Sequence, residues 1–180
     1  MRLVSSFILR VLGWKVSGYS PDRLTKCIIL AVPHTSNWDF PLGLLVRSYL
    51  STDIKFVGKE ELFTGIQGKI VHFLGGVPVK RNTHSSFVED VATMFSTRES
   101  FRICIAPEGT RMPVKALKSG FYRIARAADV PVILVKWDFG NKHIKFSEPW
   151  YMTADKDKDM KKVEEYFRGT IGKVAEYSFL

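Results

Sequence analysis

The sequence predicts an α/β fold, a single domain whose mostly parallel or mixed central sheet is flanked by helices. Residues 27–32 form a continuous apolar run, residues 101–106 are apolar except for Arg102, and a proline follows each segment, a pattern typical of strands buried on both faces. Segments with helical spacing alternate with these strands along the chain. The 180 residues, 46% of them hydrophobic and 25% charged, suit one domain with a core of its own.

Residues 1–16 predict an amphipathic helix that is set apart from a domain over residues 17–180. Its apolar residues recur at helical spacing: Leu3, Val4, Phe7, Ile8, Val11 and Leu12. Arg10 and Lys15 interrupt the stretch before the roughly 20 apolar residues that a membrane-crossing helix needs, and a secretory cleavage site is not expected. Such a helix either lies in a membrane interface or packs on the domain's own core, and both remain open.

The other elements follow in order after a turn-rich connection over residues 17–25. The predicted strands cover residues 27–32, 54–57, 77–79, 101–106, 130–137 and 143–146, and the predicted helices cover residues 41–50, 60–74, 85–96, 118–128 and 158–177. Asp39 is expected to cap the helix over residues 41–50, with Pro41 in its first turn. In such folds ligands gather beyond the carboxyl ends of the strands, so the polar residues after the two buried strands form the candidate site.

The charge favours some partners and excludes others. Lys and Arg number 27 against 18 Asp and Glu, a formal net charge of +9, which favours phosphate-bearing or carboxylate-bearing partners such as anionic lipid. The sequence has no nucleic-acid-binding signature, so no nucleic-acid partner is expected. Cys27 and Cys104 lie in apolar runs without metal-ligand spacing, and His72, His84 and His143 are interpreted as ordinary polar residues. We therefore expect no metal and no cofactor.

His34 and Asp39 follow the first buried strand and form the candidate catalytic pair. A carboxylate on one imidazole nitrogen fixes the tautomer and raises the basicity of the other nitrogen, which makes a general base. Taken alone, a histidine followed five residues later by an aspartate is also compatible with ordinary polar groups in a loop.

Glu108, Gly109, Thr110 and Arg111 follow the second buried strand. Gly109 lets the backbone come close to a ligand, and Thr110 and Arg111 can donate to an oxyanion. The planar fork of an arginine suits phosphate. The alternative is an ordinary turn with a solvated arginine.

A third cluster surrounds the short strand over residues 77–79. Gly75 and Gly76 precede this strand, and Lys80 and Arg81 end it. Adjacent cations at the end of a strand are often merely solvated. Further positive charge comes from Lys59, Lys118 and Arg123.

In order and spacing these blocks resemble the glycerolipid acyltransferase family typified by the 1-acylglycerol-3-phosphate acyltransferases. The similar blocks are His34 to Asp39 (histidine, four residues, aspartate), Val57 to Leu62, Gly75 to Arg81, Glu108 to Arg111, and Val130 with Pro131. Several blocks in the family's order are far more specific than any one of them. The chain departs from the family pattern at Pro78 and Lys80, which leaves the identity of the acceptor open.

The resemblance implies an O-acyltransferase of phospholipid biosynthesis. It implies that His34 removes a proton from the acceptor hydroxyl and Asp39 orients His34. Its substrate-binding residues would be Arg81 and Arg111, which hold a phosphate, together with Glu108, Gly109, Thr110, Lys80, Gly75 and Gly76. The acyl donor would be a thioester, either acyl-CoA or an acyl carrier protein, and the acceptor a lysophosphatidic acid or related lysophospholipid. An acyl-thioester hydrolase, a non-glycerophosphate acceptor and an inactive membrane-binding module remain alternatives.

Two further expectations concern the mechanism and the location. Backbone N–H groups of residues 36–39, at the start of a helix, are expected to meet the oxyanion, with no covalent acyl-enzyme. The chain is expected to be cytoplasmic and peripheral, on the anionic inner face of the membrane.

Overall fold

The structure, a computed structural model, describes residues 2–79 and 84–179 and confirms the predicted fold class. The described strands form one seven-stranded sheet. They are β1 (Lys15–Gly18), β2 (Lys26–Val32), β3 (Lys55–Lys59), β4 (Gly76–Val79), β5 (Phe101–Ile105), β6 (Val132–Asp138) and β7 (His143–Phe146). The α-helices are α1 (Arg2–Val11), α2 (Asp39–Leu50), α3 (Gly65–Phe73), α4 (His84–Thr97), α5 (Gly120–Ala128) and α6 (Lys156–Phe167), with short 3-10 helices η1 (Pro21–Arg23), η2 (Glu60–Phe63) and η3 (Ala175–Tyr177).

The order of the strands brings the two polar clusters of the sequence together. The strand order is β1-β7-β6-β2-β5-β3-β4, and of these neighbouring pairs only β6 with β7 is antiparallel. β2 lies between β6 and β5, with Ile28 paired to both Val132 and Ile103. Because β2 and β5 are parallel neighbours, the loops after their carboxyl ends lie side by side.

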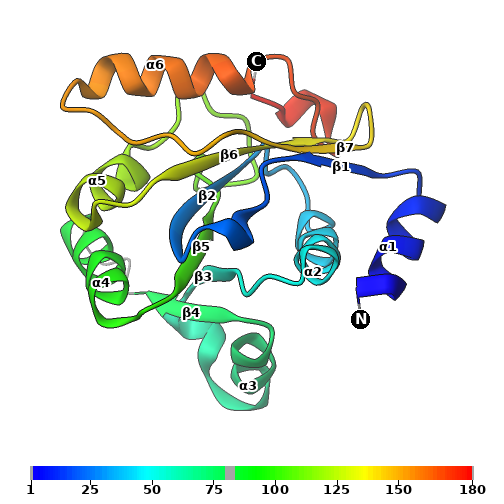
Figure 1. Cartoon of the computed structure of the whole chain (residues 1–180), viewed down its shortest axis with the longest axis horizontal. Helices are drawn as coiled ribbons and strands as arrows, with labels where there is room; N and C mark the ends of the chain where they lie inside the picture. Colours follow the sequence, from blue (N-terminus) through cyan, green and yellow to red (C-terminus); the bar gives the residue numbers. More distant parts are fainter. Residues whose placement is uncertain (1, 80–83, 180) are drawn as a thin grey trace.

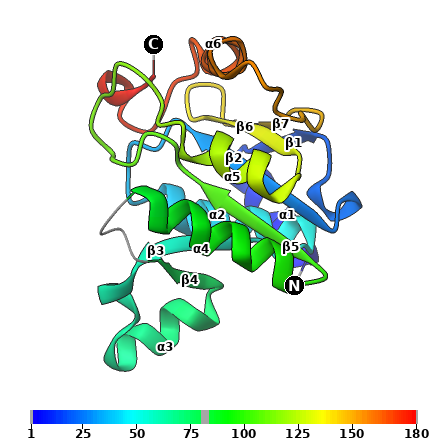
Figure 2. The same ribbon diagram turned by 90° about the vertical axis from the view of Figure 1, so that its left-hand side faces the viewer.

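Helices cover both faces of the sheet, as Figures 1 and 2 show from two sides. Alternate residues of a strand point to opposite faces, and after Lys26 both sets of β2 are apolar. Ile28 and Leu30 belong to the core that includes residues of α4, α5 and α6. Cys27 and Ile29 belong to the second core, which includes Leu9 of α1 and residues of α2.

The predicted helix over residues 1–16 ends at Val11. Gly13 has a φ of +77°, and the Trp14 N–H bonds back to the carbonyl of Leu9 at 2.8 Å, which closes the helix. The chain then forms β1, parallel to β7, where a continued helix and then a turn were predicted, so that prediction was wrong. Only Val16 of this edge strand is even half-buried, which leaves no hydrophobic pattern to detect.

The prediction of a helix over residues 158–177 was wrong for the second half of that range. α6 ends at Phe167, and Gly169, with a φ of +74°, turns the chain out of the helix. The predicted helix over residues 60–74 is likewise divided, into η2 and α3, just before Gly65, whose φ is +62°. In both places a glycine in the left-handed region marks the break.

Candidate active site

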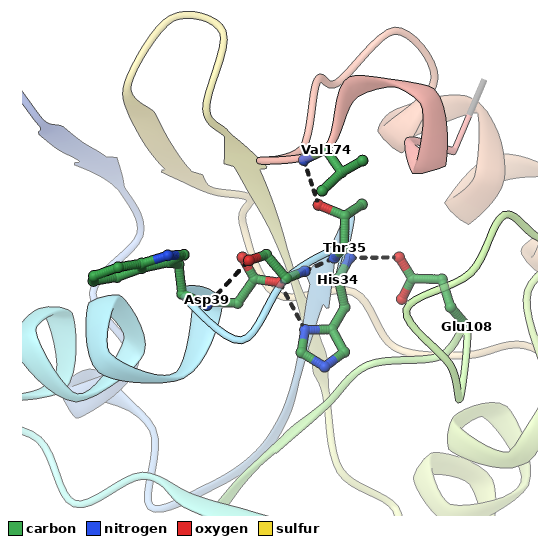
Figure 3. A network of polar contacts seen from close by, with 7 residues as sticks. His34, Thr35, Asp39, Glu108 and Val174 are labelled. Carbon is green, nitrogen blue, oxygen red and sulfur yellow. Dashed lines mark hydrogen bonds and ion pairs between the residues drawn. The ribbon is translucent and has the colours of Figure 1, made fainter.

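His34 and Asp39 form a hydrogen-bonded pair in the loop between β2 and α2. His34 Nδ1 lies 2.8 Å from Asp39 Oδ2, and the same oxygen accepts the backbone N–H groups of Thr35 and Ser36 at 3.0 Å (Figure 3). Asp39 is buried, whereas 28% of the His34 side chain is exposed. The pairing that the spacing suggests is therefore present in the structure.

Asp39 does not cap α2, and that prediction was wrong. The cap position is Trp38, whose side chain makes no cap hydrogen bond, and Asp39 is the first residue of the helix. Its carboxylate turns back to the preceding loop, where it meets one imidazole nitrogen and two backbone donors. This position of Asp39 leaves its negative charge available to the histidine.

The remaining ring nitrogen of His34, Nε2, is the one available to act as a base. An ionised carboxylate accepts a hydrogen bond from Nδ1–H, so Nε2 keeps a free lone pair. His34 lies on the wall of a cleft of about 1470 Å³. A hydroxyl bound there at hydrogen-bond distance from Nε2 would find a general base.

Glu108 supports the same loop from the end of β5. Its Oε1 accepts the backbone N–H of His34 at 2.8 Å (Figure 3), while Oε2 is buried without a partner among the described residues. Burial raises the pKa of this carboxyl group. Glu108 is only 4% exposed and does not line the cleft, so it acts on the loop that carries His34.

The cleft is apolar along its inner part. Its lining there comes from α2 and from the sheet face beneath it: Ile29, Ala31, Gly43, Leu44, Val46, Phe56, Val135, Trp137 and Phe146. A Cβ placed on Gly43 would make ordinary van der Waals contact with the Trp137 ring at 3.9 Å, so the lining has room for a methyl group at this point. Cys104 also lines the cleft, but burial raises its pKa to about 12, which keeps it a thiol and a poor nucleophile.

The mouth of the cleft, by which we mean the part whose lining side chains are exposed, carries positive charge. Arg111, Lys118 and Arg123 line it with exposed side chains, and the described part of the chain offers these side chains no ion-pair or hydrogen-bond partner. Gly109 has a φ of +66°, and a Cβ there would lie 2.6 Å from Lys118 Nζ, so the glycine lets the ammonium group approach the backbone. Thr110 lies beside them on the wall, with its hydroxyl accepting the Met112 N–H at 3.2 Å.

Arg47 and Lys55 also line the cleft but are already engaged. Arg47 Nη1 donates to the carbonyls of Ile54 and Leu74, and Lys55 pairs with Asp53 at 3.0 Å. We did not identify Arg47 from the sequence, although a single arginine within an apolar helix is a detectable signal. Its bonds tie α2 to the segments before β3 and β4.

The third cluster is only partly visible. Lys80 and Arg81 fall outside the described residues, so their predicted role stays a prediction. Gly75 and Gly76 do not line the cleft. A Cβ on Gly75 would overlap the Arg47 guanidinium, and one on Gly76 would lie 2.7 Å from Val71 Cγ1, so close packing explains both glycines.

The backbone N–H groups expected to meet the oxyanion are mostly occupied. Those of Ser36, Trp38 and Asp39 donate to Asp39 Oδ2, Ser36 Oγ and the Ser36 carbonyl, respectively. The prediction was therefore wrong for these three. The Asn37 N–H has no partner in the part of the chain that the structure describes.

Most of the chain is similar to known proteins. The profile of the family described as Acyltransferase matches residues 15–136, more than half of the chain. No curated protein matches the sequence. Among solved structures, the fold is similar to that of the 1-acyl-sn-glycerophosphate (LPA) acyltransferase PlsC from Thermotoga maritima, with a TM-score of 0.60 and 20% identity over 92% of this chain and 74% of that chain. At this identity the likeness concerns the fold alone.

Proposed function

We propose a function for this chain from one premise: the chain belongs to the acyltransferase family. The proposed function is to transfer a fatty acyl group from a thioester to a hydroxyl of a lysophosphatidic acid or related lysophospholipid in phospholipid biosynthesis. The match to this family agrees with the resemblance of the sequence blocks to the glycerolipid acyltransferases. One observation carries the proposal: His34, whose Nδ1 is paired with Asp39, lines a cleft with cations at its mouth and apolar side chains along its inner part. Such a cleft suits a substrate with a phosphate head and a long hydrocarbon chain.

The proposed reaction is direct transfer. His34 Nε2 takes the proton as the acceptor oxygen bonds to the thioester carbonyl carbon. The tetrahedral intermediate then collapses, the carbon–sulfur bond breaks, and the leaving thiolate takes the proton from the imidazolium. Asp39 stabilises the positive ring while it exists, and the donor is acyl-CoA or an acyl carrier protein.

The cations at the mouth are proposed to bind the phosphate of the acceptor. Arg111 can form two parallel hydrogen bonds to phosphate oxygens, and Lys118 and Arg123 add charge on the same wall. Arg81 and Lys80 are proposed to join them, as the family resemblance implies. Phosphate binding places the acceptor so that its hydroxyl meets His34.

The chain is further proposed to act on a membrane surface. α1 exposes large apolar side chains, among them Leu3, Phe7 and Val11. α3 exposes Ile66, Ile70 and Phe73, which recur at helical spacing. Val71 and Leu74, by contrast, line the cleft, so α3 lies beside the route by which a lipid would enter. None of the described helices is long and apolar enough to cross a bilayer.

The net charge of +9 favours an anionic surface, which agrees with a peripheral location on the cytoplasmic, inner face. Co-sedimentation with phosphatidylcholine vesicles, with and without phosphatidylglycerol, tests this location. We expect Phe73→Ser to weaken binding to anionic vesicles, whereas Tyr151→Ser, the matched loss of an exposed aromatic outside α1 and α3, leaves it unchanged. Equal binding by both variants and the wild type would remove α3 from the membrane contact.

Mass spectrometry of the products tests the activity itself. Purified protein receives one acyl thioester and a panel of lysolipids, with His34→Ala as the inactive control. We expect a lysophosphatidic acid or a related lysophospholipid to gain the mass of the acyl chain. Free fatty acid released at the same rate with and without lysolipid would instead indicate a thioester hydrolase. A gain confined to acceptors that lack a glycerophosphate would refute the proposed acceptor.

A further inference from the structure

The end of the chain, residues 168–179, folds back onto the domain; we call it the C-terminal segment. It follows α6, turns at Gly169 and packs on the domain. The carbonyl of Ile171 accepts the Phe139 N–H at 2.7 Å, and the Phe179 side chain is buried in the core beside α4, α5 and α6. The segment lies beyond residues 15–136, which the family profile matches.

The C-terminal segment contacts the catalytic loop directly. The Val174 N–H donates to Thr35 Oγ1 at 3.1 Å, as Figure 3 shows. Gly172 packs against the same side chain: a Cβ there would lie 2.6 Å from Thr35 Oγ1 and 3.1 Å from Pro33 Cγ. Any side chain at position 172 would therefore push on the residues on either side of His34.

Thr35 connects this contact to the catalytic pair. Its backbone N–H donates to Asp39 Oδ2 at 3.0 Å, the oxygen that also bonds to His34 Nδ1. Its hydroxyl faces the other way and accepts from the segment. Thr35 is only 4% exposed and does not line the cleft, so it acts through its neighbours and not on a substrate.

We propose that the C-terminal segment positions the His34–Asp39 pair, with Thr35 and Gly172 as its positioning residues. The inference rests on the proposed function. The His34 backbone N–H is held by Glu108 on one side, and the neighbouring Thr35 is held by the segment on the other. A displacement of the order of 1 Å at a reacting group can cost about 100-fold in rate, so a loop held at both points protects turnover.

The test compares two identical substitutions. Thr35→Val removes the hydroxyl that accepts from Val174. Thr170→Val makes the same change within the C-terminal segment, where the Thr170 hydroxyl is buried without a partner among the described residues, so no hydrogen bond is lost. We expect Thr35→Val to lower kcat about 10- to 100-fold with little change in the acceptor KM. Thr35→Ser, which keeps the hydroxyl, should recover most of the turnover, and Thr170→Val should behave as the wild type.

A second readout needs no substrate, so it separates this inference from the proposed function. Hydrogen exchange reports on the Thr35 and Ser36 amides, which donate to Asp39. We expect these amides to exchange faster in Thr35→Val than in Thr170→Val. If no variant, wild type included, transfers an acyl group, the proposed function fails while this difference still supports the positioning role.

Gly172→Ala is the second variant, in case Thr35→Val does not fold. The added methyl group would push on Thr35 without removing a hydrogen bond, so we expect the same loss of kcat and the same faster exchange. Circular dichroism and the thermal midpoint establish that each variant is folded. The inference would be overturned if folded Gly172→Ala had the kcat and the exchange rates of the wild type. It would also be overturned if Thr35→Val matched Thr170→Val in both kcat and exchange rates.

Discussion

Asp39→Asn tests how much the carboxylate contributes to the proposed base. The substitution keeps the size of the side chain but removes the charge that faces His34 Nδ1 at 2.8 Å. When the ring takes up a proton, two unit charges at this distance attract by about 6 kcal/mol at an effective dielectric constant of about 20, and by about 1.5 kcal/mol at that of water. Because the His34 side chain is 28% exposed, we expect a loss nearer the lower value.

A loss of about 1.5 kcal/mol corresponds to roughly a tenfold fall in kcat, which is the minimum we expect. The acceptor KM should change little, since Arg111 and Lys118 are untouched. Initial rates of thiol release at several acceptor concentrations separate the two constants. Asp157→Asn, the same change on the exposed first turn of α6, is the control and should match the wild type. A kcat for Asp39→Asn within twofold of the wild type would refute the reasoning.

Two further predictions concern the residues around the pair. Arg111→Ala should raise the acceptor KM about 10- to 100-fold with a smaller effect on kcat, because a charge-assisted hydrogen bond contributes about 1.5–3 kcal/mol; an unchanged dependence on acceptor concentration would contradict a phosphate role. Burial raises the pKa of Glu108, so the protonated carboxyl contributes stability that is fully present below its unfolded pKa of about 4.3 and is lost as pH rises through the folded pKa. Glu108→Gln keeps an acceptor for the His34 N–H, so its free energy of unfolding should rise relative to that of the wild type as pH increases from about 4 to 8. Denaturant titrations measure this difference. A difference that stays constant with pH would contradict the burial argument.

Much of the fold could be predicted because its central strands are unambiguous. β2 is apolar on both faces from Cys27 onward, β5 is apolar except for Arg102, and the polar clusters after these strands identified the site. β1 was missed because an edge strand that is exposed along most of its length has no hydrophobic period. The end of α6 was missed although Gly169 and Gly172 were visible in the sequence, because the charged stretch over residues 158–177 was interpreted as one closing helix.

The site was predicted in part: contacts within one loop could be predicted, whereas contacts between distant parts of the sequence could not. The separation of His34 and Asp39 fits a short loop, so local geometry suffices to pair them. The hydrogen bond between Thr35 and Val174 joins residues 139 positions apart, and no local pattern encodes such a contact. Glu108 was identified by its motif, but its bond to the His34 backbone depends on β2 and β5 being neighbours.

The central claim is that His34 removes the proton from the acceptor, and His34→Ala tests it most directly. The measurement is the rate of acyl transfer to a lysophosphatidic acid by folded variant and wild-type protein at saturating donor. We expect a fall of at least about 100-fold, the lower end of what general-base catalysis contributes. Turnover close to that of the wild type, in a variant with an unchanged circular dichroism spectrum, would contradict the claim.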